Sequence, residues 1–323
     1  MGQTLSEPVT AKQSTVVQDA RFKVGASCMQ GWRVSMEDSH THILSLPDDP
    51  GTAFFAVYDG HGGATIAQYA GKHLHKYIVR RPEYGSGQLE EALKQGFLEL
   101  DAAMQREESL REEVAGSTAV AVMVKDEVLY CANVGDSRAV ASIKGKAEPL
   151  SVDHKPNNEG EMRRIIAGGG HVEFNRVNGN LALSRALGDF GFKANANLPP
   201  QEQIVTAFPD VVIQNITDDW EFLVIACDGI WDVLSSQDVV DFCREALKEG
   251  CEPSEVCEKL MQLCLAPDCG MGGLGCDNMT VLLICLTKDI TFQQLQAKLQ
   301  QKEVSKEGET TEAKEDHEEE GLA

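Results

Sequence analysis

The sequence predicts an α+β fold in which sheets of mainly antiparallel strands pack together under helices that cover their outer faces. Only short turns separate three consecutive strand-like segments, STAVAVMV, EVLYCANV and RAVASIK. Short connections indicate antiparallel neighbours, because parallel strands need a crossover of roughly a dozen residues. The helical segments come mostly in pairs, which suits helices that lie on stacked sheets. This pattern excludes a doubly wound parallel sheet.

Apolar residues recur at the i, i+3, i+4 spacing of an amphipathic helix in several segments. These segments span residues 64–79, 88–108, 158–167, 237–248, 254–265 and 291–300. No long linker rich in proline or serine interrupts the chain between Phe22 and Leu286. We therefore expect one continuous domain over residues 22–290. A polar arm over residues 1–21 is expected to be flexible, and a short helix and a disordered acidic tail are expected over residues 291–323.

The composition is that of a large, acidic, globular protein. The 323 residues are 42% hydrophobic and carry a formal net charge of −22. Phosphate backbones bind clustered lysine and arginine, so this charge argues against nucleic acid as a partner. No apolar run approaches the roughly 20 residues of a membrane helix, and the N-terminus has no apolar signal core. We expect a monomeric cytoplasmic protein, with the nucleus left open.

Ten cysteines raise the question of a disulfide framework or a zinc site. Six of them lie between Cys243 and Cys276, at spacings that never form the CxxC pairs of a structural zinc site. We interpret the segment CREALKEGCEPSEVCEKLMQLCLAP as two helices with buried thiols. In a long chain without a signal sequence, the thiols are expected to stay reduced.

Several strand-like segments end at an acidic residue. Asp59 follows FFAVY, Asp228 follows FLVIAC, Asp136 follows VLYCANVG, and Asp277 comes just before NMTVLLICL. Each Asp-Gly pair alone is ordinary turn chemistry. A rigid sheet with carboxylates at several strand ends can also present oxygen ligands to a hard cation. Convergence of these strand ends would form an oxygen-rich pocket.

A further acidic pair, Glu37 and Asp38, follows Arg33 in GWRVSMEDSH. Clustered carboxylates suit Mg²⁺ or Mn²⁺, and no set of His and Cys ligands competes with them. Two such cations roughly 4 Å apart would lower the pKa of a bridging water for attack on phosphorus. Arg33 could then bind the phosphate through two parallel N–H groups. His61 could protonate the departing oxygen, or it could be a plain surface turn histidine.

Six motifs together resemble the metal-dependent protein phosphatases of type 2C. In chain order between about Phe22 and Leu286 they are GWRVSMEDSH, VYDGHGG, ANVGDSRAV, LALSRALGD, ACDGIWDV and GCDNMTVLLI. The resemblance implies a β-sandwich of two mainly antiparallel sheets flanked by helices on both outer faces, so that residues 22–290 form a phosphatase catalytic domain. It also implies two Mg²⁺ or Mn²⁺ ions that hydrolyse phosphoserine and phosphothreonine in proteins through a metal-bridging hydroxide, without a phosphoenzyme.

The resemblance assigns metal ligands residue by residue. Asp59 would bridge both metals. The carbonyl of Gly60 and the side chain of Glu37 would complete the shell of one metal. Asp228 and Asp277 would hold the other.

Supporting roles follow from the same resemblance. Asp38 would orient metal-bound water, Arg33 would bind the phosphate, and His61 would be the general acid. Asp136 would join a weaker third metal, although a structural turn after the strand explains it about as well. Arg185 is interpreted as a structural ion-pair partner and is left out of the site.

Residues 188–209, rich in Gly, Asn and Pro, resemble the flap that borders the cleft in this family, and we expect them to be mobile. The chain departs from some family members, because only the segment 291–300 and the acidic tail follow the last strand. Regulation through an additional helical domain is therefore not expected.

The opening MGQTLS matches the N-myristoylation pattern, with Gly2 as the acceptor. A single myristoyl chain without a basic cluster gives only weak, reversible membrane attachment. The alternative is an inert arm.

Two other functions stay open. The first is a catalytically silent, metal-binding scaffold that recognises phosphoproteins, but such a scaffold would usually have lost at least one metal ligand. Glu37, Asp59, Asp228 and Asp277 are all present. The second is hydrolysis of nucleotides or small phosphate esters, which relative turnover on phosphopeptide and nucleotide would separate.

Overall fold

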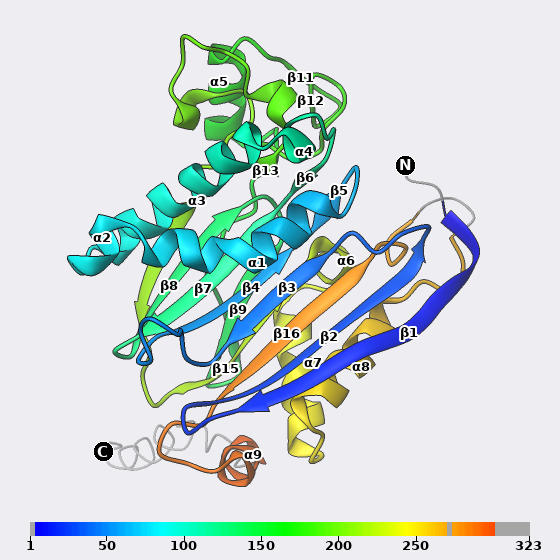
Figure 1. Ribbon diagram of the computed structural model, residues 1–323. Helices are drawn as coiled ribbons and strands as arrows, with labels where there is room; N and C mark the ends of the chain where they lie inside the picture. The colour runs from blue at the N-terminus through cyan, green and yellow to red at the C-terminus, as the bar shows by residue number, and fades with distance from the viewer. Residues whose placement is uncertain (1–3, 270–272, 301–323) are drawn as a thin grey trace, which may run out of the picture.

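The computed structural model describes residues 4–269 and 273–300, in which two antiparallel sheets pack face to face (Figure 1). The first sheet has the strand order β1-β2-β16-β15-β9-β10, and the second sheet has the strand order β14-β8-β7-β4-β3. The first consists of β1 (Thr4–Gln18), β2 (Phe22–Arg33), β16 (Met279–Leu286), β15 (Trp220–Ala226), β9 (Arg138–Ile143) and β10 (Lys146–Pro149). The second consists of β14 (Asp210–Asn215), β8 (Val128–Val134), β7 (Ala119–Lys125), β4 (Ala53–Tyr58) and β3 (Ser39–Ile43). The predicted α+β sandwich is confirmed.

Helices cover both outer faces (Figure 1). On the second sheet lie α1 (Thr65–Val79) and α3 (Leu89–Arg106), and on the first lie α7 (Ser236–Lys248) and α8 (Pro253–Cys264). Two further helices are α5 (Glu159–Ala167) and α9 (Phe292–Gln300). All of these begin and end within two residues of the predicted segments. The one-turn helices α2 (Pro82–Gly85), α4 (Glu108–Arg111) and α6 (Asp228–Trp231) are too short for a periodic pattern to reveal.

Strand β4 shows how the sequence builds a core on both faces of one sheet. Its residues AFFAVY are all buried, and successive side chains point to opposite faces. Phe54 and Tyr58 pack among the apolar residues of α1 and α3, whereas Phe55 and Val57 pack against the first sheet. The strand is apolar on both faces, so its first acidic residue, Asp59, comes where the strand ends.

The N-terminal residues differ from the flexible arm expected over residues 1–21, because residues 4–18 form β1 at the edge of the first sheet. β1 pairs with β2 from Gln18 opposite Lys23 to Thr4 opposite Arg33. Ser14 Oγ also donates a hydrogen bond to Glu258 Oε1 on α8 at 2.6 Å. Most β1 side chains are exposed, so main-chain hydrogen bonds hold the strand. Apolar periodicity in a sequence gives no sign of main-chain hydrogen bonds, which is why this strand was not predicted.

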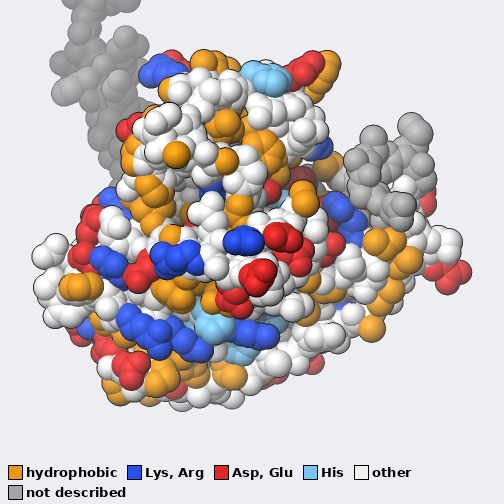
Figure 2. Space-filling model, turned by 45° about the horizontal axis from the view of Figure 1, so that its top comes forward, with side chains coloured by type: hydrophobic (Ala, Val, Ile, Leu, Met, Phe, Trp, Pro, Cys, Tyr) orange, Lys and Arg blue, Asp and Glu red, His pale blue; other side chains and the backbone are white. Residues whose placement is uncertain are grey.

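Two predicted features lie outside the described residues, namely Gly2 as acyl acceptor and the acidic tail over residues 302–323. Among residues 4–269 and 273–300, no helix combines the length and the apolar character that a membrane span requires. Figure 2 shows acidic, basic and histidine side chains interspersed on the face it displays. The excess of acids therefore does not form a single large patch on that face.

Gly25 in β2 lets the start of α8 approach the first sheet closely. A Cβ added at Gly25 would lie 2.3 Å from the carbonyl carbon of Pro253. We expect Gly25→Ala to lower the free energy of unfolding by about 1–3 kcal/mol, the usual cost of overpacking, in urea denaturation at saturating Mg²⁺. Gly160→Ala in α5 is the control, because nothing lies within 4 Å of a Cβ there. Equal losses in both variants would contradict the packing explanation.

Candidate active site

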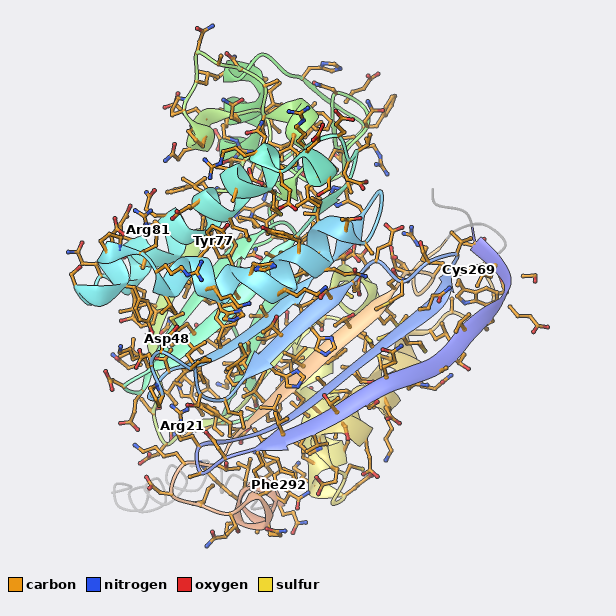
Figure 3. All side chains as sticks on the ribbon, in the orientation of Figure 1. Arg21, Asp48, Tyr77, Arg81, Cys269 and Phe292 are labelled. Carbon is orange, nitrogen blue, oxygen red and sulfur yellow. A yellow bond between two sulfur atoms is a disulfide. The ribbon has the colours of Figure 1, made fainter. Side chains whose placement is uncertain are left out.

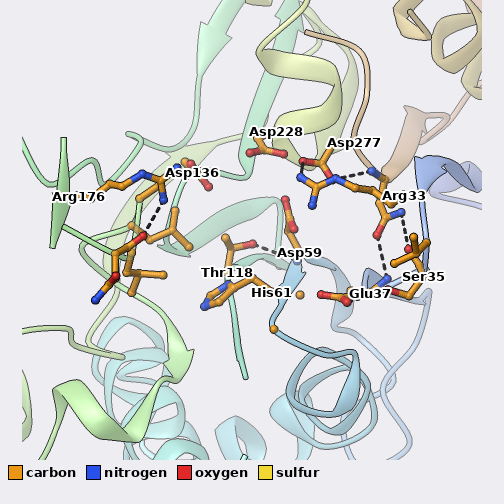
Figure 4. Close-up of a pocket in the computed structure, with 18 residues that line it drawn as sticks. Arg33, Ser35, Glu37, Asp59, His61, Thr118, Asp136, Arg176, Asp228 and Asp277 are labelled. Atoms are coloured by element: carbon orange, nitrogen blue, oxygen red, sulfur yellow. Dashed lines mark hydrogen bonds and ion pairs between the residues drawn. The ribbon is translucent and has the colours of Figure 1, made fainter. Parts of the chain in front are cut away.

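The predicted acids converge on one cleft, at the end of the sandwich where β4 and β15 end and β16 begins. The cleft has a volume of about 550 Å³. Its charged and histidine lining consists of Arg33, Glu37, Asp59, His61, Asp136, Arg176, Asp228 and Asp277. Figure 4 shows the carboxylates of Asp59, Asp228 and Asp277 around the same space, with Glu37 and His61 on its other side. Every acid proposed as a direct metal ligand therefore reaches this cleft.

Asp59 follows β4 directly and is fixed through its backbone. Its N–H donates to Thr118 Oγ1 at 3.1 Å, and its carbonyl accepts from the Thr118 N–H at 2.9 Å. The next residue is Gly60, where an added Cβ would lie 2.3 Å from the carbonyl oxygen of Glu37. Glycine at this position lets the end of β4 and the Glu37 loop approach each other, which brings Asp59 and Glu37 into one site.

Asp228 and Asp277 come from the neighbouring antiparallel strands β15 and β16. Asp228 begins α6 just after β15, and Asp277 lies just before β16, so both sit at the same end of the strand pair. The junction is tight, because a Cβ added at Gly229 would lie 2.2 Å from the carbonyl oxygen of Asn278. An antiparallel pair thus brings together two acids that are far apart in the sequence.

The carboxyl groups repel one another in a partly buried site. Burial, followed by the charge of Asp228, raises the pKa of Asp59 well above its ordinary value. Burial, followed by the charge of Asp136, does the same for the pKa of Asp228. Burial is also the main reason that the pKa of Asp38 rises to about 7. A divalent cation would favour the ionised form of each acid and offset this repulsion.

The donor set fits a hard divalent cation. Asp38 Oδ2 accepts from the Thr280 hydroxyl at 2.7 Å, whereas Asp38 Oδ1 is buried with no hydrogen-bond partner. Asp38, Asp59 and Cys227 offer atoms that all lie within 4.8 Å of one another. Cys227 is fully buried, and burial raises the pKa of its thiol well above the ordinary value. Carboxylate oxygens, rather than a thiolate, are therefore the ligands that this site presents.

Arg33 and Glu37 line the cleft from the end of β2 and the loop that follows it. Glu37 accepts hydrogen bonds from Ser35 Oγ at 2.8 Å and from the Gly63 N–H at 3.1 Å. Arg33 forms an ion pair with Asp277, and the Arg33 side chain remains 37% exposed. A phosphate group that enters the cleft can therefore reach the guanidinium.

Asp136 is buried, lines the cleft and forms an ion pair with Lys155. Burial raises the pKa of Asp136, and the charge of Lys155 opposes that rise. The ion pair with Lys155 is what a structural role of Asp136 would require. The position of Asp136 at the cleft is what a ligand of a third metal would require. Arg185, left out of the predicted site, binds Glu161 and Asp210 at 2.7 and 2.8 Å and does not line the cleft.

The segment that borders the cleft differs from the expected flap over residues 188–209. Arg176 and residues 180–183 line the cleft, whereas no residue of 188–209 does. The predicted segment instead supplies Asp189, whose Oδ2 lies 2.7 Å from His61 Nε2. Its Gly- and Asn-rich composition signals turns but does not tell which turn faces the cleft.

Sequence reasoning missed the residues Thr118, Asp189, Cys227 and Asn278, which shape the site. Asn278 Oδ1 accepts from the Glu37 N–H at 2.9 Å, and its Nδ2 donates to the Ser35 carbonyl at 3.0 Å. Its place beside Asp277 in GCDNM was an available signal. Thr118 gave no signal, because its role depends on the pairing of β7 with β4.

The cysteine prediction needs one correction next to this site. Cys269 and Cys276 form a disulfide, with Cα atoms 6.0 Å apart, and both pack against Trp32 (Figure 3). Cys276 immediately precedes Asp277 in the sequence. The spacing alone did not indicate that the chain turns back here. The thiols within and between the two predicted helices are free and buried, as expected, at Cys243, Cys251, Cys257 and Cys264.

Comparisons with known proteins identify the family of this chain. Residues 22–271 match the family model described as Protein phosphatase 2C. The chain is 62% identical over 286 residues to a Caenorhabditis elegans protein named Probable protein phosphatase 2C T23F11.1, covering 88% of this chain and 80% of that protein. It is 51% identical to Protein phosphatase 2C homolog 2 of Schizosaccharomyces pombe, covering 88% and 78% of the two chains. A crystal structure of a phosphatase from Toxoplasma gondii matches with a TM-score of 0.74 at 29% identity, covering 86% of this chain and 96% of that one. The chain therefore belongs to the protein phosphatase 2C family of serine/threonine phosphatases.

Proposed function

We propose that this protein hydrolyses phosphoserine and phosphothreonine in protein substrates with two Mg²⁺ or Mn²⁺ ions held in the cleft. The observation that carries the proposal is the convergence of Glu37, Asp59, Asp228 and Asp277 beside Arg33. Four carboxylates would be costly to bring together without cations, and an exposed arginine beside them is suited to bind a phosphate.

The acids divide between the two ions in the way that the family resemblance assigns. Asp59 would bridge them, Glu37 and the Gly60 carbonyl would hold one ion, and Asp228 and Asp277 would hold the other. When bound, the ions would activate a water molecule and neutralise charge on the phosphate.

Direct attack by water, without a phosphoenzyme, agrees with the side chains around the cleft. The Thr118 hydroxyl accepts from the Asp59 N–H, and its oxygen lies 2.7 Å from that of Ser137. The Ser35 hydroxyl donates to Glu37. The Cys227 thiol is fully buried and its pKa is raised by burial. These groups are engaged or protonated, which disfavours them as nucleophiles.

His61 lies at the rim of the cleft, and its side chain is 29% exposed. Burial lowers the pKa of His61, but the hydrogen bond and the charge of Asp189, together with the charges of Asp136 and Glu37, raise it overall. A protonated imidazole in this place can give its proton to the departing serine or threonine oxygen.

The decisive test of the function is release of phosphate from a phosphothreonine peptide by the full chain in EDTA, in Mg²⁺ and in Mn²⁺. We expect release with either metal and none in EDTA, and slower turnover of ATP and other nucleotides at equal concentration. Metal binding without release from peptide or aryl phosphate would favour the scaffold alternative. Faster turnover of nucleotides than of peptide would favour a small-ester hydrolase.

His61→Gln tests the general acid. We expect kcat on the phosphothreonine peptide to fall by about 10²-fold, the lower end of general acid–base contributions. The fall on p-nitrophenyl phosphate should be much smaller, because its leaving oxygen needs little protonation. Equal losses on both substrates would remove His61 from this role.

We also propose that Asp136, which shares the cleft with Asp228, takes part in a weaker third metal site when Lys155 moves away. A monomeric, cytoplasmic protein with weak, reversible membrane attachment through myristoyl-Gly2 likewise remains our proposal. Mass spectrometry of the protein isolated from its own cells would test the acylation at Gly2.

A further inference from the structure

His61 is held by a buried acid that does not line the cleft. Its Nε2 lies 2.7 Å from Asp189 Oδ2, although the two residues are 128 positions apart. The Asp189 side chain is only 6% exposed, against 29% for His61. Asp189 is absent from the cleft lining, whereas His61 is part of it. Asp189 therefore contacts the cleft through the side chain of His61.

A small sheet brings the two residues together. It has the order β13-β6-β5, with β13 (Leu187–Gly188), β6 (Gly116–Ser117) and β5 (Gly60–His61). Gly116 pairs with His61 on one side and with Gly188 on the other. Asp189 follows Gly188 and donates its N–H to the Ala115 carbonyl at 3.0 Å. The backbone thus sets the separation between the acid and the imidazole.

Gly116 leaves room for this hydrogen bond. A Cβ added there would lie 2.1 Å from Asp189 Oδ2 and 2.4 Å from His61 Nε2. These are the two atoms of the hydrogen bond itself. The strand between β5 and β13 therefore needs a residue without a side chain at this position for the bond to form.

The backbone of Asp189 has φ 48° and ψ 41°, in the left-handed region that residues other than glycine seldom adopt. Such a conformation persists where its surroundings fix it, and it is common where a residue has a role in a site. Here the surroundings include Asp101, which accepts from the Gly188 N–H and from Lys193 Nζ, each at 2.8 Å. The ion pair of Asp101 and Lys193, with side chains 13% and 7% exposed, holds this segment through contacts that do not involve His61.

We propose that Asp189 is a positioning residue that holds the His61 ring so that Nδ1, not Nε2, faces the substrate. This inference rests on the proposed role of His61 as general acid. A carboxylate can only accept, so Nε2 donates its hydrogen to Asp189 and is not available to the substrate. The second ring nitrogen, Nδ1, then delivers the proton.

The proton balance of the step is simple. As the bond from phosphorus to the substrate oxygen breaks and the bond from phosphorus to the attacking water oxygen forms, the proton on Nδ1 moves to the leaving oxygen and gives the free serine or threonine hydroxyl, while the attacking water releases one proton to solvent. Solvent returns a proton to Nδ1 before the next turnover. The hydrogen between Nε2 and Asp189 stays on Nε2, so Asp189 remains a carboxylate throughout.

Asp189→Asn tests the proposal, since it removes the charge at nearly constant volume. We expect kcat on the phosphothreonine peptide to fall about 10- to 100-fold, the usual cost of losing a group that orients a functional histidine, with KM changed less than about twofold. On p-nitrophenyl phosphate kcat should fall much less. Combined with His61→Gln, the substitution should cause no further loss on the peptide, because both act on one proton transfer.

Asp101→Asn is the matched control, because Asp101 is a largely buried acid on α3 that holds the same segment through Gly188 and Lys193 instead of through His61. We expect it to lower the melting temperature and to change kcat on both substrates by similar factors. An Asp189→Asn enzyme that also lowers both by similar factors would overturn the positioning role. If His61→Gln still separates the two substrates in that case, the proposed function stands while this inference fails. Equal losses from His61→Gln on both substrates would overturn this inference together with the general-acid role of His61.

A second measurement reads the ring nitrogens of His61 in the wild-type protein and does not require an Asp189 variant. In ¹⁵N-histidine NMR spectra of the wild-type full chain, with the His61 signal assigned by its loss in His61→Gln, the neutral ring should carry its hydrogen on Nε2. A neutral ring with its hydrogen on Nδ1 would overturn the proposal.

Discussion

Asp59→Asn is expected to reduce kcat on a phosphothreonine peptide by at least about 10³-fold at saturating Mg²⁺ or Mn²⁺. The substitution keeps the volume of the side chain but removes the charge of the residue proposed to bridge both ions. Loss of metal-assisted stabilisation amounts to several kcal/mol in the transition state, and about 1.4 kcal/mol corresponds to a factor of ten in rate. Phosphate release and the melting temperature should be measured on the same preparations.

The matched control for this prediction is Asp48→Asn. Asp48 is exposed in the loop between β3 and β4 and does not line the catalytic cleft (Figure 3). The Asp48→Asn variant should release phosphate at the wild-type rate. Isothermal titration with Mn²⁺ should show weaker binding to the Asp59 variant and unchanged binding to the control. Wild-type turnover by the Asp59 variant at saturating metal would contradict the metal centre.

The free energy of unfolding of the metal-free protein is expected to fall as the pH rises. Burial holds the pKa of Asp38 at about 7 in the folded chain, against an ordinary value of 3.8. The folded state therefore binds a proton that the unfolded state releases, so stability falls as pH rises from about 4 to above 7. At about 1.4 kcal/mol for each pKa unit, Asp38 alone accounts for about 4 kcal/mol at pH 8. Burial raises the pKa of Asp59 and Asp228 too, and they act in the same direction.

Asp38→Asn isolates this effect. In EDTA at pH 8 the variant should melt about 10 °C above wild type, since about 4 kcal/mol shifts a domain of this size by that order. At pH 5 the two proteins should melt close together, because wild-type Asp38 is then protonated. Saturating Mg²⁺ should raise the wild-type melting temperature more at pH 8 than at pH 5. A melting difference between variant and wild type that is equal at both pH values would rule out titration of Asp38 as the cause.

The longer helices, the antiparallel pairing and the acids that converge on the cleft could be predicted, because each leaves a local trace in the sequence. β4 is apolar throughout and is followed by Asp59, so the end of the strand also marks a residue of the cleft. The six motifs add the order in which the acids of the cleft appear along the chain. A carboxylate at a strand end can therefore be recognised from the sequence alone, without knowledge of how the strands pair.

Features held by contacts between distant segments could not be predicted. β1 is exposed on most of its side chains and owes its structure to pairing with β2, so its polar sequence resembles that of a flexible arm. Asp189 lies far from His61 in the sequence, and only the β13-β6-β5 sheet brings them together. The place of Arg176 and residues 180–183 at the cleft likewise depends on how distant segments of the chain pack together.

The pairing of Thr4 with Arg33 has a practical consequence for anyone who produces this protein. Thr4 lies beside Arg33, the arginine proposed to bind phosphate. Helix α9, which ends at Gln300, lies at the far end of the sandwich (Figure 1). An affinity tag or a fluorescent fusion at the N-terminus would emerge next to the mouth of the cleft and compete with bulky phosphoproteins for access. Tags and surface anchors for assays with whole protein substrates therefore belong at the C-terminus.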